Sequence, residues 1–193
     1  MQEIQRKQKE IDALRIDAAL RQSENPLALQ DLLETLEDDR DHHLEHALHK
    51  CSNGPYYLEN PQLARVVYDA CLWLEQHKGL KVFAFCIMSN HVHLLAGSAS
   101  GIPIAAGPIM KTLKGYTGRK CNQLLDRHGH KFWEKNYYDR DVRPNTFYTV
   151  IWYILNNPVK AGLVDQWQDW PFTYLCPDLL PLFADPDLNA DVE

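Results

Sequence analysis

The sequence predicts an α+β fold, in which helices pack on an antiparallel sheet. A strongly apolar run over residues 80–88 is followed by the dipeptide Ser-Asn and by a second apolar run over 91–97, which is the pattern of a β-hairpin. On either side of this hairpin, apolar residues recur at three- and four-residue steps, over 62–77 and over 146–157. That spacing is typical of amphipathic helices.

The first fifty residues predict a polar helical extension. Residues 2–22 and 27–49 have helical patterns, and the sequence SENP at 23–26 separates them. The second of these helices carries four histidines at helical spacing, which favours a solvated helix face and leaves a metal cluster as the alternative. These histidines are His42, His43, His46 and His49. No strand is predicted within residues 1–50.

The elements after residue 50 follow from local signals. Gly79 is expected to end the helix over 62–77, and residues 98–108 form a flexible connection to a helix over 109–125. Residues 131–143 alternate loosely and predict an aromatic-rich strand. Asn145 is expected to cap the helix over 146–157, which should end before Pro158 because proline lacks the amide proton of a helical residue.

Charge is distributed unevenly along the chain, although the net charge is −6. Residues 1–50 carry 7 basic and 12 acidic side chains, whereas residues 111–143 carry 9 basic against 4 acidic, and residues 165–193 hold 7 acids and no base. A polyanion such as a nucleic acid would therefore bind to the middle of the chain. The alternative is a solvated helix face with compensating charges.

Composition also limits the class of protein. No apolar run approaches the roughly 20 residues needed to cross a bilayer, and the charged start has no secretory signal pattern. The five cysteines are odd in number and widely spaced, so neither a disulfide framework nor a zinc knuckle is predicted. We therefore expect a cytoplasmic protein with no membrane partner.

Two histidines open the second strand of the predicted hairpin. His91 and His93 are two residues apart in a segment that otherwise has buried character, and residues i and i+2 of a strand share a face. Neutral imidazoles that converge in this way favour a metal site or a proton relay. The incidental alternative is two structural histidines.

Tyr153 and Asn157 are one turn apart on the predicted late helix, so they share a face. If that helix lies over the hairpin, both side chains face the two imidazoles. Two imidazoles and an amide oxygen make an open site that suits Mg²⁺ or Mn²⁺. A phenol beside such a cation can attack a phosphodiester. The structural alternatives are a core tyrosine and a helix-capping asparagine.

Five motifs in order resemble the single-tyrosine HUH transposases, and the branch they resemble most is the REP-associated tyrosine transposases. The motifs are MSNHVHLL, LKGYTGRKCNQLL, FWEKNYYDRDVR, YILNNPVKAGLV and DWPFTY. The resemblance covers about residues 50–175. It implies a domain over 51–175 with a ferredoxin-like antiparallel sheet and helices on one face, preceded by the helical segment 1–50 and followed by a loose acidic tail over 176–193.

The resemblance also implies roles for individual residues. His91 and His93 would be metal ligands, with Asn157 as the third protein ligand, and Tyr153 would be the nucleophile that forms a 5′-phosphotyrosine with single-stranded DNA. Substrates would contain hairpins or palindromic repeats, and the protein would act as a monomer or a homodimer. Members of the family usually have a strand ahead of the first helix, proline at the position of Ser89 and often histidine at that of Arg140.

The basic middle of the chain supplies the expected DNA contacts. We predict that these come from Lys111, Lys114, Arg119, Lys120, Arg140 and Arg143. Trp133, Tyr137 and Tyr138 either stack on bases or pack the sheet.

Three functions stay open at this point. The first is a metal-dependent transposase that cleaves and rejoins single-stranded DNA through Tyr153, with Tyr116 as a rival nucleophile. The second is a DNA-hairpin-binding protein that has lost catalysis, which is suggested by the missing first strand. The third is a phosphoesterase that holds zinc or manganese with His91, His93 and either Cys86 or Cys121.

Overall fold

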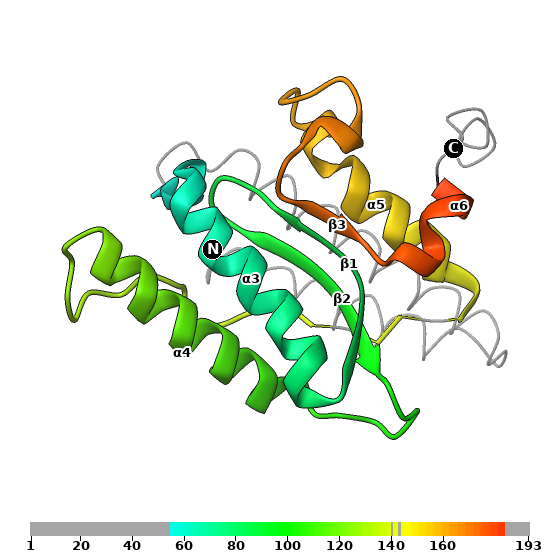
Figure 1. Cartoon of the computed structure of the whole chain (residues 1–193), viewed down its shortest axis with the longest axis horizontal. Coiled ribbons are helices and arrows are strands. Elements are labelled where there is room, and N and C mark those ends of the chain that lie inside the picture. Colours follow the sequence, from blue (N-terminus) through cyan, green and yellow to red (C-terminus); the bar gives the residue numbers. More distant parts are fainter. Residues whose placement is uncertain (1–54, 140, 143, 184–193) are drawn as a thin grey trace, which may run out of the picture. The chain divides into compact units, whose positions relative to one another are not determined.

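A computed structural model describes residues 55–139, 141–142 and 144–183 (Figure 1). The described residues belong to one compact unit, and they form an α+β fold with a three-stranded antiparallel sheet. The predicted fold class is therefore confirmed. The predictions for residues 1–50, including the absent first strand and the histidine cluster, lie outside the described residues, as do Arg140 and Arg143.

The first described helix, α3 (Pro61–Lys78), has clear signals at both ends. The Asn60 side chain accepts a hydrogen bond from the Gln62 amide, and Pro61 occupies the first turn, where its missing N–H costs nothing. Gly79 ends the helix with a φ of 65°, a left-handed conformation that favours glycine. A short 3-10 turn, η1 (Tyr57–Glu59), comes before the helix.

The predicted hairpin is confirmed as β1 (Leu80–Ile87) and β2 (Val92–Ser98). A bulge at Phe83 interrupts the pairing between Val82 and Ala84, so the residues of β1 change face at that point. As a result Cys86 pairs with His93, and the two side chains share one face of the sheet.

The third strand differs from the prediction. Strand β3 (Thr173–Leu175) pairs with β1 on the side opposite β2, which gives the order β2-β1-β3. Within 131–143, where an aromatic-rich strand was expected, the described residues form no strand. This segment instead crosses helix α4 (Ala106–Leu124), to which it is held by side-chain hydrogen bonds.

Helix α5 (Phe147–Lys160) continues through Pro158, contrary to the prediction that it ends before this residue. The proline lies near the end of the helix and removes only the hydrogen bond to the Ile154 carbonyl. Its ring is buried, so packing offsets the lost bond. The expected Asn145 cap is also wrong, because Asn145 lies within the 3-10 turn η2 (Pro144–Thr146) and Thr146 occupies the cap position.

Helices cover both faces of the sheet rather than one. Val82, Phe85 and Ile87 share a core cluster with α3 and α4. Ala84, Cys86 and Met88 point the other way, into a cluster that includes residues of α5. Figure 1 shows α3 and α4 side by side, with α5 on the other side of the hairpin near β3.

Residues 176–183, which were expected in a loose tail, pack on this second core. They form the 3-10 turn η4 (Pro177–Leu179) and the short helix α6 (Leu180–Phe183), which follow another 3-10 turn, η3 (Trp167–Asp169). Phe183 is only 2% exposed, and its ring lies 5.0 Å from that of Trp152, centroid to centroid. Phe183 therefore anchors this segment to the core, although the tail over 176–193 as a whole is acidic. Residues 184–193 lie outside the described residues.

Candidate active site

Two imidazoles meet at the turn of the β1–β2 hairpin. His93 lies in β2, whereas His91 lies in the turn just before it, where its carbonyl accepts a hydrogen bond from the Met88 amide. The Nε2 atoms of His91 and His93 are nevertheless 3.0 Å apart, and the two rings are nearly perpendicular. The predicted convergence of the two imidazoles is thus present in the structure, although only His93 belongs to a regular strand.

The orientation of His91 is set by its neighbour. Its Nδ1 atom lies 2.6 Å from Oδ1 of Asn90, which can only accept a hydrogen bond. This contact is a hydrogen bond when the proton of His91 is on Nδ1, and in that tautomer the lone pair is on Nε2, the atom nearest His93. An outer partner that fixes the tautomer in this way is typical of histidines that bind metals.

The spacing of the two imidazoles fits a divalent cation. Ring nitrogens bind such ions at about 2.1 Å, and two of them at right angles around an octahedral ion are about 3.0 Å apart. The measured separation of 3.0 Å between the Nε2 atoms agrees with that arrangement. The donor pair is therefore suited to two adjacent positions around Mg²⁺ or Mn²⁺, which leaves further positions for oxygen ligands.

Tyr153 comes to this pair from α5. Its ring is perpendicular to that of His93, with 5.7 Å between centroids, and it is half-buried in the core that β1 and α5 share. The side chain of Lys160, two turns further along α5, places its ammonium 4.8 Å from the centre of the Tyr153 ring. The Tyr153 phenol, the two imidazoles and the Lys160 ammonium therefore lie at one end of the hairpin.

Asn157 is fully buried on the same helix. Its side-chain amide donates a hydrogen bond of 2.9 Å to the carbonyl of Tyr153, one turn earlier. This bond holds the asparagine against the segment that carries the tyrosine. The alternative of a helix-capping asparagine is wrong, because α5 continues to Lys160 and Ala161 occupies the C-cap position. The hydrogen bond gives Asn157 a structural role inside the helix, and its role as a metal ligand stays a prediction.

The ligand set predicted for a zinc phosphoesterase does not form. Among the residues that the structure describes, no three His, Cys, Asp or Glu side chains gather to hold a metal. Burial raises the pKa of the Cys86 thiol to about 12. Cys121 is also buried, and its thiol has a pKa raised to about 11 by burial.

The comparisons with known proteins decide the family. A family model described as "Transposase IS200 like" matches residues 56–157. The chain belongs to this family. The match runs from η1 to Asn157, so it contains the two histidines and Tyr153 but not β3. No curated protein and no solved structure matches the chain.

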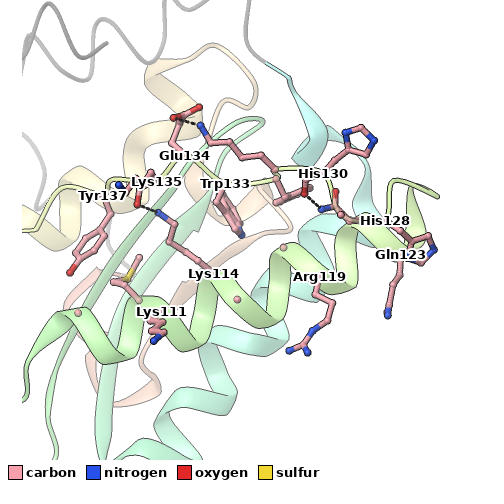
Figure 2. Close-up of a pocket in the computed structure, with 18 residues that line it drawn as sticks. Lys111, Lys114, Arg119, Gln123, His128, His130, Trp133, Glu134, Lys135 and Tyr137 are labelled. Carbon is pink, nitrogen blue, oxygen red and sulfur yellow. Dashed lines mark hydrogen bonds and ion pairs between the residues drawn. The ribbon is translucent and has the colours of Figure 1, made fainter.

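Five lysine and arginine residues of this IS200-like transposase line a groove that α4 and residues 128–137 form together (Figure 2). Of the predicted DNA contacts, Lys111, Lys114 and Arg119 line the groove, and Lys120 does not. Lys114 donates hydrogen bonds of 3.2 Å to the carbonyls of both Lys135 and Asn136. This lysine therefore holds the two walls together.

The three aromatic residues that were expected to stack on bases or pack the sheet differ in their exposure. The indole N–H of Trp133 donates to the Thr117 hydroxyl at 2.8 Å, and the ring lies beside Gly118 of α4. Tyr137 and Tyr138 are 41% and 42% exposed. Of the three aromatic residues considered for base stacking, Trp133 and Tyr137 line the groove and Tyr138 does not.

Sequence reasoning missed two residues of this site. Asn90 holds His91, and Lys160 lies over Tyr153, but neither was predicted to take part. Asn90 could have been noticed as a polar neighbour of the pair. Lys160 lies seven residues after Tyr153, which places both on one helical face if the helix crosses Pro158.

No helix among the described residues has the length and apolar character needed to span a membrane.

Proposed function

We propose that this transposase cuts and rejoins single-stranded DNA, with Tyr153 as the nucleophile. The observation that carries the proposal is the meeting of the Tyr153 and His93 rings, 5.7 Å apart, where His93 in turn lies 3.0 Å from His91. Among aromatic contacts of the described residues, it is Tyr153 and not Tyr116 that meets His93. Tyr116 is exposed on α4.

The proposed step is one phosphoryl transfer. The Tyr153 oxygen attacks the phosphorus of one backbone linkage, the bond from phosphorus to the 3′ oxygen breaks, and a 5′-phosphotyrosine forms. The phenol gives up its proton to solvent, and the departing 3′ oxygen takes one up. Because the phosphoester bond energy is retained in the adduct, a 3′ hydroxyl can reverse the step and rejoin a strand without a nucleotide cofactor.

We propose that His91 and His93 hold a Mg²⁺ or Mn²⁺ ion, with the Asn157 amide oxygen as the third donor. When bound, the cation would stabilise the negative charge that develops on the phosphorus oxygens. The chain's own residues have separate parts in this proposal. Asn90 keeps the Nε2 lone pair of His91 available, and Lys160 places a positive charge beside the phenol.

The proposed substrate is DNA that contains hairpins or palindromic repeats, as the resemblance to the REP-associated branch suggests. The basic groove supports a nucleic-acid substrate, because Lys111 and Arg119 extend from α4 where phosphates can reach them. A monomer and a homodimer are both compatible with this proposal.

A cleavage assay tests the proposal. The protein is incubated with an end-labelled single-stranded hairpin DNA and Mn²⁺, and a covalent adduct that survives denaturation is expected. Tyr153→Phe should abolish the adduct, and both His91→Ala and His93→Ala should reduce it strongly. Salt-dependent DNA binding with no cleavage under any divalent cation would instead support the alternative of a hairpin-binding protein without catalysis.

A further inference from the structure

The groove between α4 and residues 128–137 is a second site, separate from the imidazole pair. Its volume is about 650 Å³, and neither of the two histidines at 91 and 93 nor Tyr153 lines it. Cavities of this size hold small molecules and pieces of larger ligands. The groove therefore needs an explanation that the phosphoryl transfer does not provide.

The charge of the groove points to an anionic ligand. Five lysine and arginine side chains line it against one acid, Glu134, and this acid is paired with Lys131 at 2.7 Å. Lys111 and Arg119 are exposed at the rim, and Figure 2 shows both extending outward from α4. Two unburied cations on one helix can each contact a phosphate.

A glycine in α4 leaves space that the protein does not use. Gly115 and Gly118 both line the groove, although glycine is unfavourable within a helix. A Cβ atom at Gly118 would lie 3.3 Å from Cδ1 of Trp133, so the packing of the indole explains that glycine. A Cβ atom at Gly115 would meet open space, with nothing within 4 Å apart from the neighbouring residues and backbone of its own helix. At Gly115 the helix therefore leaves the groove open to a ligand.

A buried acceptor in the groove also lacks a partner. Asn122 is 6% exposed, and its side-chain amide donates to the carbonyl of His130. Its Oδ1 atom is buried and accepts no hydrogen bond from any described residue. Buried polar atoms are rarely left in this state.

The walls of the groove present aromatic surface. Trp133 is held in place by its hydrogen bond to Thr117, and Tyr137 stands at the other end of the groove beneath the Lys114 ammonium, 5.6 Å from it. Aromatic rings beside cations are the usual means of binding single-stranded nucleic acid, because every unpaired base exposes a flat face. In a duplex these faces are stacked and not accessible.

From these features we infer that the groove binds an unpaired nucleotide of the DNA strand. The base lies over Gly115 between the aromatic side chains, and the flanking phosphates contact Lys111 and Arg119. This inference rests on the proposed function, since it assigns the groove to the same single-stranded substrate. It adds a binding site at which an unpaired base is held apart from the phosphodiester that is cut.

Binding measured without catalysis tests the inference. Tyr153→Phe protein in EDTA is titrated into a fluorescein-labelled, unstructured ten-nucleotide DNA, and anisotropy gives Kd. Lys111→Gln and Arg119→Gln should each weaken binding at least about fivefold and lower the salt slope by about one. Lys120→Gln removes the same charge from the same helix outside the groove, and it should change Kd less than about twofold. Equal effects of all three substitutions would overturn the inference.

A second variant separates binding from folding. Gly115→Leu replaces a poor helix former with a good one, so Tm should be unchanged or higher. The leucine side chain fills the space above residue 115, so Kd for the single strand should rise about tenfold. Unchanged binding by Gly115→Leu would overturn the inference. The inference would also be overturned if a duplex of the same sequence bound as tightly as the single strand and if Gly115→Leu weakened both complexes equally.

The two proposals fail in different ways. If the protein forms the Tyr153 adduct with Mn²⁺ but Gly115→Leu leaves its Kd for single-stranded DNA unchanged, only the groove assignment is contradicted. A protein whose binding responds to Gly115→Leu and Lys111→Gln, yet which forms no adduct, contradicts only the proposed phosphoryl transfer.

Discussion

The ring of Tyr153 is perpendicular to the ring of His93, with 5.7 Å between the two centroids. One ring belongs to a strand near the middle of the chain and the other to a helix some sixty residues later, and the shared core of β1 and α5 brings them together. The register of the hairpin contributes to this contact, because His93 pairs with Cys86, whose side chain lies in the core shared with α5. The proposed chemistry depends on that register.

The first prediction concerns Asn90. Asn90→Ala removes the acceptor that fixes the His91 tautomer, so the affinity for Mn²⁺ should fall about 10- to 100-fold. Titration calorimetry of the purified protein measures this directly. Ser89→Ala changes the preceding turn residue and keeps the backbone hydrogen bond from Leu58, so it should bind Mn²⁺ as the parent does. Equal affinities of Asn90→Ala and the parent would contradict the role of Asn90.

The second prediction concerns Lys160. Its ammonium lies 4.8 Å from the centre of the Tyr153 ring, where it can stabilise negative charge on the attacking oxygen. Lys160→Met should slow adduct formation by roughly 10- to 100-fold. Lys160→Arg keeps the charge and should retain most of the rate. Single-turnover kinetics with labelled hairpin DNA compare the two, and similar losses in both variants would indicate a purely steric role.

The third prediction concerns the end of the described chain. Phe183→Ala should lower the free energy of unfolding by about 3–5 kcal/mol, because the side chain is 2% exposed and fills the core beside Trp152. Leu182→Ala is the matched control, since Leu182 is 49% exposed and should cost little. Urea denaturation provides both values. If the two variants unfold alike, α6 does not belong to the core.

The fourth prediction concerns pH. Burial raises the pKa of the Cys71 thiol from 9.0 to about 12, so above pH 9 this thiol ionises in the unfolded chain but not in the folded one. Stability is therefore retained below pH 9 and lost as the pH rises, by about 1.4 kcal/mol per pH unit for each such thiol. Cys71→Ala should make the decline between pH 10 and pH 11 shallower by about that amount. An unchanged slope would contradict the shift.

Much of the fold could be predicted because its signals are local. The two apolar runs of the hairpin, the helical spacing before them and Gly79 are all signals within a few residues, and all three were interpreted correctly. The third strand could not be found in this way. Thr173–Leu175 is too short to have a period of its own, and only its pairing with β1 makes it a strand.

Two other errors have the same origin. The alternation of residues 131–139 suggested a strand, but Lys114 and Trp133 tie this segment to a helix instead. Pro158 suggested a helix end, but burial of its ring against the core carries the helix to Lys160. In each case a tertiary contact outweighed a local preference that had been assessed correctly.

The candidate site was predictable in its residue types and less so in its geometry. The two-residue spacing of His91 and His93 suggested convergence on a strand, whereas one of them lies in the turn and is oriented by Asn90. The basic residues were predicted as a set of DNA contacts. The structure separates Lys120 from the groove and uses Lys114 to join its walls. Such distinctions require knowledge of which helix face is covered.

The most direct test of the central claim is to identify the amino acid that becomes linked to DNA. The adduct formed with hairpin DNA and Mn²⁺ is digested with nuclease and protease, and the modified peptide is sequenced by mass spectrometry. A phosphodiester-linked nucleotide on Tyr153 is expected. A nucleotide on another residue such as Tyr116, with Tyr153 unmodified, would contradict the account.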